Sequence, residues 1–338
     1  MSDFWSNKRV CVTGGAALIG SHLVEELLKL NPKALWVVDD MSSGKQENLP
    51  PNVPVYYKDL RDDESAETLY NANIVFHLAA AHGGRAFVDT HDVECYDNFD
   101  IDTTVYRLCA ESKHVEKVVY MSSACAYDTS IQQDVTADLK LSESMIDYAK
   151  PIVPDGAYGE QKYVSEKILR AYAKRGAFKG VAVRGFTVYG KRVSLTHFIG
   201  AAIARTMIHQ DPLVIFGDGN QKRNWTFASD TARGLILAAE KMDEGVVNIG
   251  TEEANTPNTV YPILWDLFGW QPKEIQYQPN HLVGTANRIA DASKARELLG
   301  WTPQYDIRRG LAETVAWFKE HYTVDELQDH FEQKLFER

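Results

Sequence analysis

The chain opens with an apolar strand that runs through a glycine-rich turn into a helix, and this order limits its fold more than any other feature. Residues 9–13 form the strand, and residues 23–30 carry a helical apolar repeat. Further short apolar runs follow, separated by helical stretches, at residues 35–39, 54–57, 74–78, 118–121 and 180–184. Continuous apolar strands that alternate with helices are typical of a parallel sheet covered on both faces. We therefore expect an α/β fold with a doubly wound parallel sheet.

The turn contains Gly14, Gly15 and Gly20, between the first strand and the first helix. In a Rossmann-type sheet, such glycines permit a tight turn and let backbone N–H groups and the helix N-terminus approach a pyrophosphate. Ala17 departs from the pattern, because a Gly-x-x-Gly-x-x-Gly loop normally has its middle glycine at this place. The turn predicts a dinucleotide site, with a purely structural turn as the alternative.

A carboxylate ends the second strand. Asp39 follows the turn at close to the spacing of about 20 residues expected for a ribose-binding acid. A carboxylate there accepts hydrogen bonds from both adenosine ribose hydroxyls and repels a 2′-phosphate, which selects NAD over NADP. Asp40 would replace it if the strand end shifted by one residue. After the third strand, Asp59 and Leu60 are candidates for the adenine edge, with a turn-forming aspartate as the alternative.

A tyrosine and a lysine stand four residues apart near the start of a helical segment, at Tyr158 and Lys162. Positions i and i+4 share one face of a helix, so both side chains can point into the same cleft. A nearby ammonium lowers the pKa of a phenol and makes it a usable base. Tyr163 and Lys167 repeat the spacing but face roughly 140° away. At most one of the two pairs can therefore face a site.

Composition excludes several classes of function. The net charge of −11 argues against a general affinity for nucleic acid or anionic membranes. No apolar run approaches the roughly 20 residues of a membrane helix, and the first residues lack a signal peptide's pattern. We expect no nucleic-acid partner, no membrane and no metal site. The cysteines, at positions 11, 95, 109 and 125, show no disulfide-framework spacing, which predicts a reduced, cytoplasmic setting.

Together these segments resemble the extended short-chain dehydrogenase/reductase family of NAD-dependent nucleotide-sugar epimerases and dehydratases. The resemblance covers almost the whole chain, including residues 13–15, 37–39, 76–80, 98, 121–124, 158–162, 217–219, 223, 288–291 and 299–301. It implies NAD as cofactor, a nucleotide sugar as substrate, and a homodimer formed through residues 93–112 and the Tyr158 helix. It also implies that Tyr158 is the catalytic base, that Lys162 holds the nicotinamide ribose, and that Ser123 bridges the sugar hydroxyl and Tyr158.

The resemblance also assigns residues around the cofactor and the substrate. The implied cofactor set comprises Gly14, Ala17, Leu18, Ile19, Gly20, Asp39, Asp59, Leu60, Leu78, Ala79, Ala80, Asn98 and Lys162. The implied substrate set comprises Gly83, Gly84, Arg85, Arg223 and Arg288, in which the last two arginines would bind the diphosphate. The alternatives are a structural buried amide for Asn98 and a surface ion pair for a lone arginine.

Cys125 bears on the reaction. By resemblance, the dehydratases have an Asp-Glu pair where this chain has Ala124 and Cys125, and the decarboxylases have a glutamate at the cysteine's position. Cys125 lies two residues after Ser123, on the same side of an extended segment, so it should face the sugar. With residues 82–88, this segment is most similar to the GDP-mannose 3,5-epimerases, which use a cysteine here and a lysine on the opposite face.

The chain is shorter after Gly190 than in those enzymes, which leaves Lys191 or His197 as stand-ins for the lysine. We predict an epimerase that transiently oxidises sugar C4 with Tyr158 as base and uses Cys125 as acid/base for C3/C5 epimerisation. A simple 4-epimerase, which needs only the tyrosine, lysine and serine, is the first alternative. A catalytically silent NAD-binding regulator is the second.

The expected domain organisation has three parts. Residues 1–185 form the NAD-binding Rossmann domain, with residues 225–250 packing back on it. Residues 186–324 form a smaller, interleaved, mixed α/β lobe for the nucleotide sugar, because loop-forming glycines and prolines become frequent there. Residues 325–338 form a polar amphipathic helical tail.

Overall fold

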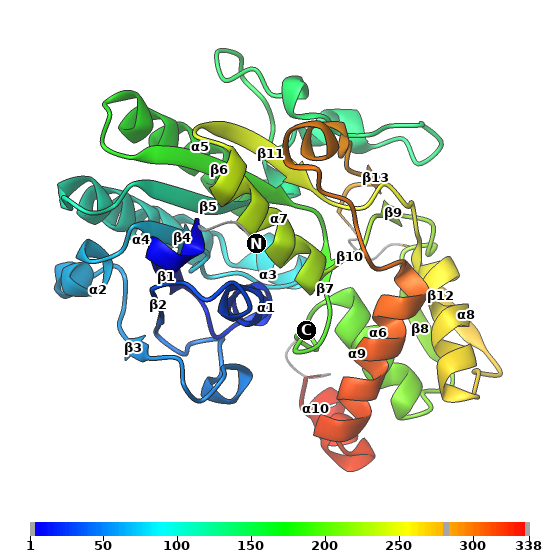
Figure 1. Ribbon diagram of the computed structural model, residues 1–338. Coiled ribbons are helices and arrows are strands. Elements are labelled where there is room, and N and C mark those ends of the chain that lie inside the picture. The colour runs from blue at the N-terminus through cyan, green and yellow to red at the C-terminus, as the bar shows by residue number, and fades with distance from the viewer. Residues whose placement is uncertain (1–3, 280–283, 335–338) are drawn as a thin grey trace.

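Within residues 4–279 and 284–334, which this computed structural model describes, seven strands form one parallel sheet (Figure 1). Their order across the sheet is β11-β6-β5-β4-β1-β2-β3. The strands are β1 (Arg9–Thr13), β2 (Ala34–Asp39), β3 (Val55–Tyr57), β4 (Ile74–His77), β5 (Lys117–Ser123), β6 (Lys179–Gly185) and β11 (Gly245–Ile249). The order reverses between β1 and β4, which places a crevice at the carboxyl ends of these strands. The predicted α/β fold is confirmed.

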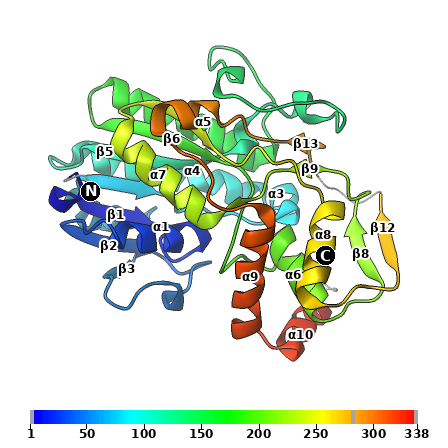
Figure 2. The ribbon, with the colours of Figure 1, turned by 45° about the vertical axis from the view of Figure 1, so that its right-hand side comes forward.

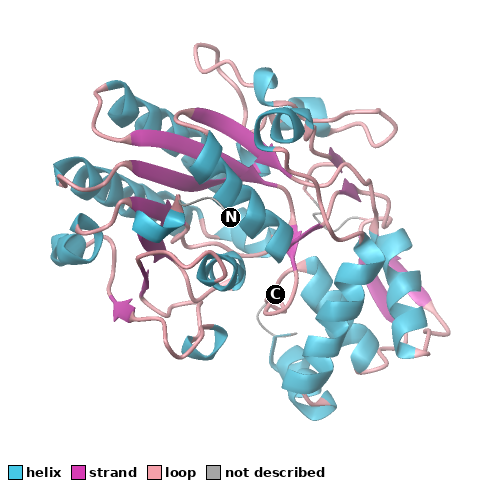
Figure 3. Ribbon diagram, viewed as in Figure 1, coloured by secondary structure: helices cyan, strands magenta, loops and turns pink. Residues whose placement is uncertain are grey.

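Helices cover both faces of the sheet (Figures 2 and 3). On one face α1 (Leu18–Leu28) packs against α7 (Ala228–Lys241), and on the other α4 (Asp92–Glu111) packs against α5 (Gly156–Lys174). The shorter α2 (Ala66–Tyr70) and α3 (Arg85–Thr90) lie on the α4 side. Successive strand residues point to opposite faces, so Val12 joins the α1–α7 core while Cys11 joins the α4–α5 core.

A second group of elements lies beside the sheet, at the lower right of Figure 1. Its helices are α6 (Phe198–Met207), α8 (Pro257–Phe268), α9 (Ile307–His321) and α10 (Val324–Lys334). Short parallel pairs join β7 (Val188–Tyr189) to β10 (Thr226–Phe227), β8 (Leu213–Phe216) to β12 (Ile275–Gln278), and β9 (Lys222–Arg223) to β13 (Asn287–Arg288). These elements share a separate apolar core, into which α10 inserts the buried Leu327.

Each predicted part of the chain includes a few residues outside the described ranges, namely 1–3, 280–283 and 335–338. The tail helix therefore continues, as far as it is described, to Lys334. None of the described helices is both long and apolar enough to cross a membrane.

Candidate active site

The glycine-rich turn lies against the carboxyl end of β4. Gly14 has a φ of +66°, and a Cβ at this position would lie 2.7 Å from the backbone nitrogen of Ala79. A Cβ on Gly20 would overlap the carbonyl oxygen of Gly14. Ala17 precedes α1 with a φ of −88° and an extended ψ of −175°, a conformation open to any residue. The turn therefore needs glycine at positions 14 and 20, whereas the methyl group of Ala17 causes no backbone strain.

Asp39 faces this turn. Its Oδ2 accepts a hydrogen bond from the Ala16 N–H at 2.9 Å, and its Oδ1 accepts one from the Met41 N–H at 2.9 Å. Burial raises the pKa of the Asp39 carboxyl, although the two backbone donors act in the opposite direction. Asp40 is exposed and accepts hydrogen bonds from Ser42 instead. Of the two adjacent aspartates, only Asp39 is directed at the turn.

Several residues of the predicted cofactor set have partners within the protein. Asn98 is fully buried, and its side chain makes two hydrogen bonds to the backbone of Ala81. It accepts from the Ala81 N–H at 2.6 Å and donates to the Ala81 carbonyl at 2.9 Å. Asp59 forms an ion pair with Arg61, which lowers the pKa of that carboxyl. Leu60 lies in the α4–α5 core. Residues 78–80 follow β4, where Leu78 and Ala79 lie against Gly14 of the turn, and Leu18 and Ile19 are the first residues of α1.

The Tyr158 side chain approaches the end of β5. A Cβ on Gly159 would overlap the Cys125 carbonyl oxygen, so this glycine lets α5 pass close to the short helix η4 (Ala124–Ala126). Ser123 ends β5 and its hydroxyl hydrogen-bonds to Tyr158. Lys162 is 3% exposed; its Nζ donates to the Met121 carbonyl at 3.2 Å and lies 5.6 Å from the centre of the Tyr158 ring. The structure therefore brings Ser123, Tyr158 and Lys162 together.

The second tyrosine–lysine pair lies on another side of α5. The Tyr163 ring stacks on Tyr148 with centroids 5.6 Å apart, and the Lys167 ammonium lies 5.3 Å from the centre of the Tyr163 ring. Neither residue contacts Ser123 or Cys125 within the described hydrogen bonds and ring contacts. This pair packs against the segment before α5.

The direction of the Tyr158 pKa differs from the prediction. Burial raises the pKa of the phenol, the neighbouring Cys125 adds to the rise, and the hydrogen bond with Ser123 only partly offsets it. The Lys162 ammonium, itself with a pKa lowered by burial, does not reverse this shift. The expected lowering is wrong for the protein without bound cofactor, because the cost of burying a phenolate exceeds the effect of the ammonium.

A buried polar network lies beneath Lys162. Asp102 of α4 is fully buried; its Oδ1 lies 2.8 Å from His77 Nε2, and its Oδ2 accepts from the Tyr120 hydroxyl at 2.9 Å and from Gln161 at 2.6 Å. The Lys162 Nζ lies 4.8 Å from the centre of the Tyr120 ring. The sequence analysis missed this network, and its one signal was an aspartate in the middle of an apolar helix face.

Cys125 is half-buried and contacts an arginine. Arg288 Nη1 donates to the Cys125 Sγ at 3.2 Å, Nη2 pairs with the Asp155 carboxylate at 2.8 Å, and Nε donates to Gln132 at 2.8 Å. Asp155 also pairs with Arg85 at 2.8 Å. The sequence analysis missed Asp155, although an aspartate just before the Tyr158 helix was a visible signal.

Arg223 lies beside Arg288 because β9 and β13 pair in parallel, with these two residues in register. Its guanidinium donates to the carbonyls of Lys222 and Thr285, each at 2.7 Å. Burial, followed by the charge of Arg288, lowers the pKa of Arg223 to about 9. Two guanidinium groups side by side, that of Arg288 buried and that of Arg223 half-buried, suit an anion with several oxygens.

A pair of histidines lies near Lys162. Gly84 contacts the Thr196 carbonyl so closely that a Cβ would overlap it, and this contact brings His82 to His197, with ring centroids 6.1 Å apart. The His82 ring is open to solvent, yet desolvation by the surrounding protein, followed by His197 and Lys162, lowers its pKa to about 4. The buried Nδ1 of His197 has no hydrogen-bond partner in the described part of the chain.

Lys191 does not join this group. Its ammonium pairs with Glu313 of α9 at 3.5 Å, and its side chain is 41% exposed. It also acts on the pKa of His22 in α1, which places it on the α1–α9 side of the molecule. Of the two stand-ins named from the sequence, His197 lies beside His82, whereas Lys191 pairs with Glu313.

Known proteins match this chain along almost its whole length. Residues 10–250 match the group described as the NAD dependent epimerase/dehydratase family. A putative UDP-glucose 4-epimerase of Methanocaldococcus jannaschii is 29% identical over 317 residues, which covers 92% of this chain and 98% of the relative. A GDP-mannose 3,5-epimerase of Oryza sativa is 26% identical over 341 residues, 96% of this chain and 86% of the relative. The structure of Thermus thermophilus UDP-glucose 4-epimerase complexed with NAD matches with a TM-score of 0.81 at 27% identity, covering 93% of this chain and 100% of that chain.

Proposed function

The chain belongs to the NAD dependent epimerase/dehydratase family, and on this premise we propose that it is a nucleotide-sugar epimerase acting through transient oxidation at sugar C4. The observation that carries the proposal is the convergence of Ser123, Tyr158 and Lys162 with Cys125 and Arg288 at the carboxyl end of β5. A silent regulator would not need a tyrosine, lysine and serine held in this arrangement.

The turn and Asp39 fit NAD. A Cβ at Gly14 would fill the space between the turn and Ala79, and the N-terminus of α1 is directed at the same place. Asp39 presents a carboxylate there, which suits ribose hydroxyls and disfavours a 2′-phosphate. The turn and Asp39 would hold the adenosine and pyrophosphate, and Lys162 would hold the nicotinamide ribose. NAD, when bound, supplies the hydride acceptor and donor.

Asp39 gives a direct test of this assignment. In Asp39→Asn we expect NAD affinity to fall by roughly tenfold or more, because a hydrogen bond to a charged acceptor contributes about 1.5–3 kcal/mol. The dissociation constant is measured by titration calorimetry with NAD and with NADP. Asp40→Asn is the matched control and should bind NAD within about twofold of the wild type, since within the described residues the Asp40 side chain hydrogen-bonds only to Ser42. Equal losses in both variants would contradict the assignment.

The proton step belongs to Tyr158. Its hydroxyl, hydrogen-bonded to Ser123, is placed to take the proton of the sugar hydroxyl at the carbon that is oxidised, and to return it afterwards. Ser123 would orient both hydroxyls. The ammonium of Lys162, held by the Met121 carbonyl, supplies the positive charge that favours the phenolate.

The arginines suit a diphosphate. Arg223 and Arg288 lie in register on β9 and β13, and burial, followed by the charge of Arg288, lowers the pKa of Arg223, an effect that a bound anion would offset. Arg85 faces the same group through Asp155, next to the Gly83–Gly84 segment. We therefore assign Arg223 and Arg288 to the diphosphate and Arg85, with the two glycines, to the sugar side.

Cys125 and His197 are the proposed acid/base pair for the carbons beside the C4 ketone. Protons on these carbons are acidified by the ketone, so a thiolate can remove one and a second group can deliver one from the other face. Arg288 Nη1 donates to the Cys125 Sγ at 3.2 Å and holds the sulfur at the carboxyl end of β5. His197 has a buried ring nitrogen, Nδ1, with no hydrogen-bond partner in the described part of the chain, and its ring centroid lies 6.1 Å from that of His82, which suits proton transfer. This supports epimerisation at C3 and C5.

A simple 4-epimerase is the second candidate. The observation that favours it is the higher identity to the Methanocaldococcus jannaschii protein, 29%, than to the 3,5-epimerase, 26%. A 4-epimerase uses Ser123, Tyr158 and Lys162 alone and turns the ketone over in the site. Cys125 would then take no part in the reaction.

Solvent deuterium separates the two candidates. If Cys125 acts as acid/base, products formed in D₂O carry deuterium at C3 or C5, and Cys125→Ser lowers this incorporation by about 10²–10⁴-fold. The measurement is NMR or mass spectrometry of products from a panel of UDP-, GDP-, CDP- and dTDP-sugars. Cys95→Ala, at a buried thiol of α4, is the control and should exchange at the wild-type rate. Turnover without any carbon-bound deuterium would instead identify a 4-epimerase.

Three further assignments remain proposals. A homodimer through α4 and α5 is supported by Val93 and Tyr96, whose side chains on α4 are 69% and 40% exposed. A cytoplasmic location is supported by four free cysteines. The division at about residue 185, with residues 225–250 returning to the first domain, is supported by the place of α7 and β11 on and in the main sheet.

A further inference from the structure

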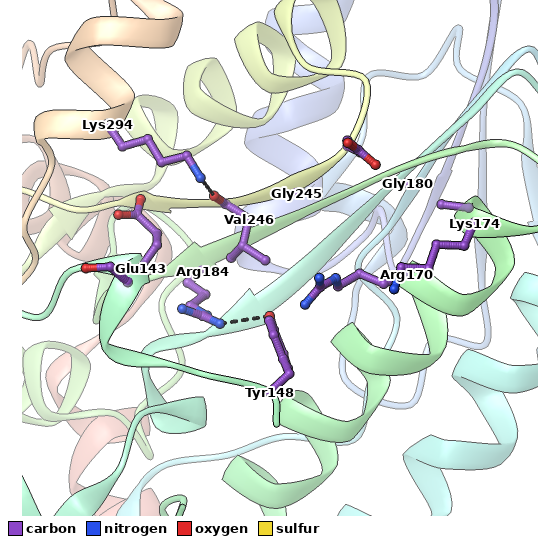
Figure 4. Close-up of a pocket in the computed structure, with 12 residues that line it drawn as sticks. Glu143, Tyr148, Arg170, Lys174, Gly180, Arg184, Gly245, Val246 and Lys294 are labelled. Carbon is purple, nitrogen blue, oxygen red and sulfur yellow. Dashed lines mark hydrogen bonds between the residues drawn. The ribbon is translucent and has the colours of Figure 1, made fainter. Parts of the chain in front are cut away.

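A cavity of about 640 Å³ lies at the β11 edge of the sheet, away from the crevice that holds Tyr158 (Figure 4). Its walls come from the C-terminal half of α5, from β6, from the first residues of β11, and from the segments around Tyr148 and Lys294. None of the proposed catalytic, cofactor or substrate residues lines it. It is therefore a separate feature of the molecule.

The cavity gathers positive charge in a chain of net charge −11. Four cations line it, namely Arg170, Lys174, Arg184 and Lys294, against the two carboxylates of Glu143 and Glu244. Figure 4 shows Arg170 and Arg184 extending toward Tyr148 from opposite sides. The guanidinium carbon of Arg170 lies 4.4 Å from the centre of the Tyr148 ring.

Two of these cations have no anionic partner. Within the described residues, Arg170 and Lys174 make no hydrogen bond or ion pair, and they stand one turn apart on α5. Like charges at this spacing repel each other and are held together at a cost unless an anion lies between them. The Glu143 carboxylate has a different partner, because its Oε1 accepts a hydrogen bond from the Asn248 N–H at 2.7 Å.

Arg184 adds a buried donor. Its side chain is 1% exposed; Nε donates to Glu166 at 2.8 Å, and Nη2 donates to Glu166 at 2.7 Å and to the Tyr148 hydroxyl at 3.1 Å. Nη1 is buried and has no partner in the described part of the chain. Glu166 also accepts from Ser122 and Tyr148, each at 2.5 Å, so the ion pair is fixed and Arg184 stays oriented. A buried donor without an acceptor is costly, and an anion would satisfy it.

We propose that this cavity is a second anion site that binds a diphosphate group through Arg170, Lys174, Arg184 and Lys294. The four cations supply donors from three sides, and Gly180 and Gly245 leave room for a group larger than a single phosphate. The diphosphate can come from inorganic pyrophosphate or from a nucleoside diphosphate. A carboxylate fits less well, because a diphosphate offers the four cations more acceptor oxygens and more negative charge.

The test counts binding events on the full-length protein by titration calorimetry with pyrophosphate, and in a second arm with UDP. Arg223→Gln weakens the proposed catalytic diphosphate site, where Arg288 alone remains, and should leave the pyrophosphate event in the cavity unchanged. The double variant Arg170→Gln/Lys174→Gln should lose this event, with affinity at least tenfold weaker, and keep the one in the crevice. If UDP binds Arg223→Gln as tightly as pyrophosphate does, the diphosphate comes from a nucleotide. If only pyrophosphate binds, the ligand is the inorganic anion.

The matched control is Lys167→Gln/Arg175→Gln, which removes two cations at and beside the same helix but outside the cavity. It should bind pyrophosphate like the wild type. Circular dichroism and melting temperature check that each variant is folded. No binding to Arg223→Gln, or equal weakening by both double variants, would overturn the proposal, and neither result touches the assignment of Tyr158, Cys125 or NAD.

Discussion

Replacing Tyr158 by phenylalanine is expected to lower kcat by about 10²–10⁴-fold, the range that a general base contributes. The ring stays half-buried beside Lys162, so binding of NAD should stay close to that of the wild type. Initial rates with the nucleotide sugar found by the panel measure the first effect, and calorimetry measures the second.

Tyr163→Phe is the control, since that residue has the same spacing to a lysine but stacks on Tyr148. Its kcat should stay within about twofold of the wild-type value. Equal losses in the two variants would show that the role of Tyr158 is structural.

The pH dependence has a sign as well: because burial raises the pKa of Tyr158, the rate should increase with pH toward the alkaline side. Lys162→Gln should move this limb to still higher pH, since it removes a charge that favours the phenolate.

Replacing Asp102 by leucine is expected to lower the free energy of unfolding by about 3–5 kcal/mol, as when one partner of a buried charged pair is removed. His77, Tyr120 and Gln161 would each lose a hydrogen bond in a site without access to water. Urea unfolding followed by circular dichroism measures the change. Asp100→Ala, on an exposed side of the same helix, is the control and should change stability by no more than about 0.5 kcal/mol.

The effect of Asp102 depends on pH with a definite sign. Burial alone would raise the pKa of this carboxyl, but the hydrogen bond and charge of His77, with the charge of Lys162, lower it below its usual value. A lowered native pKa contributes stability above the unfolded value of about 3.9, and this contribution is lost as the pH falls through the native pKa. The stability difference between wild type and Asp102→Asn should therefore be full near neutral pH and shrink below about pH 4. A constant difference down to pH 3 would contradict this account.

Local patterns carry much of the fold and part of the site. The apolar runs at residues 9–13, 35–39 and 74–78 predict buried parallel strands because each is short, continuous and followed by a helical repeat. Gly14 and Gly20 predict the turn, since their spacing and their place between strand and helix are properties of a single segment. The i, i+4 spacing of Tyr158 and Lys162 likewise needs only helix geometry.

Contacts between distant segments decide the rest. The register of β9 with β13 places Arg223 beside Arg288, and the contact of Gly84 with Thr196 brings His82 to His197. The end of β2 selects Asp39 over Asp40 by a single residue.

Neighbours along a single strand or helix are enough to predict the parallel sheet, the glycine-rich turn and the face shared by Tyr158 and Lys162. Contacts between segments were needed to find that Cys125 contacts Arg288, that Lys191 pairs with Glu313, and that the pKa of Tyr158 is raised. Ion pairs and desolvation depend on which atoms surround a group in the folded chain. For Cys125 and Lys191 the partner lies more than 100 residues away along the chain, and no local pattern encodes that approach.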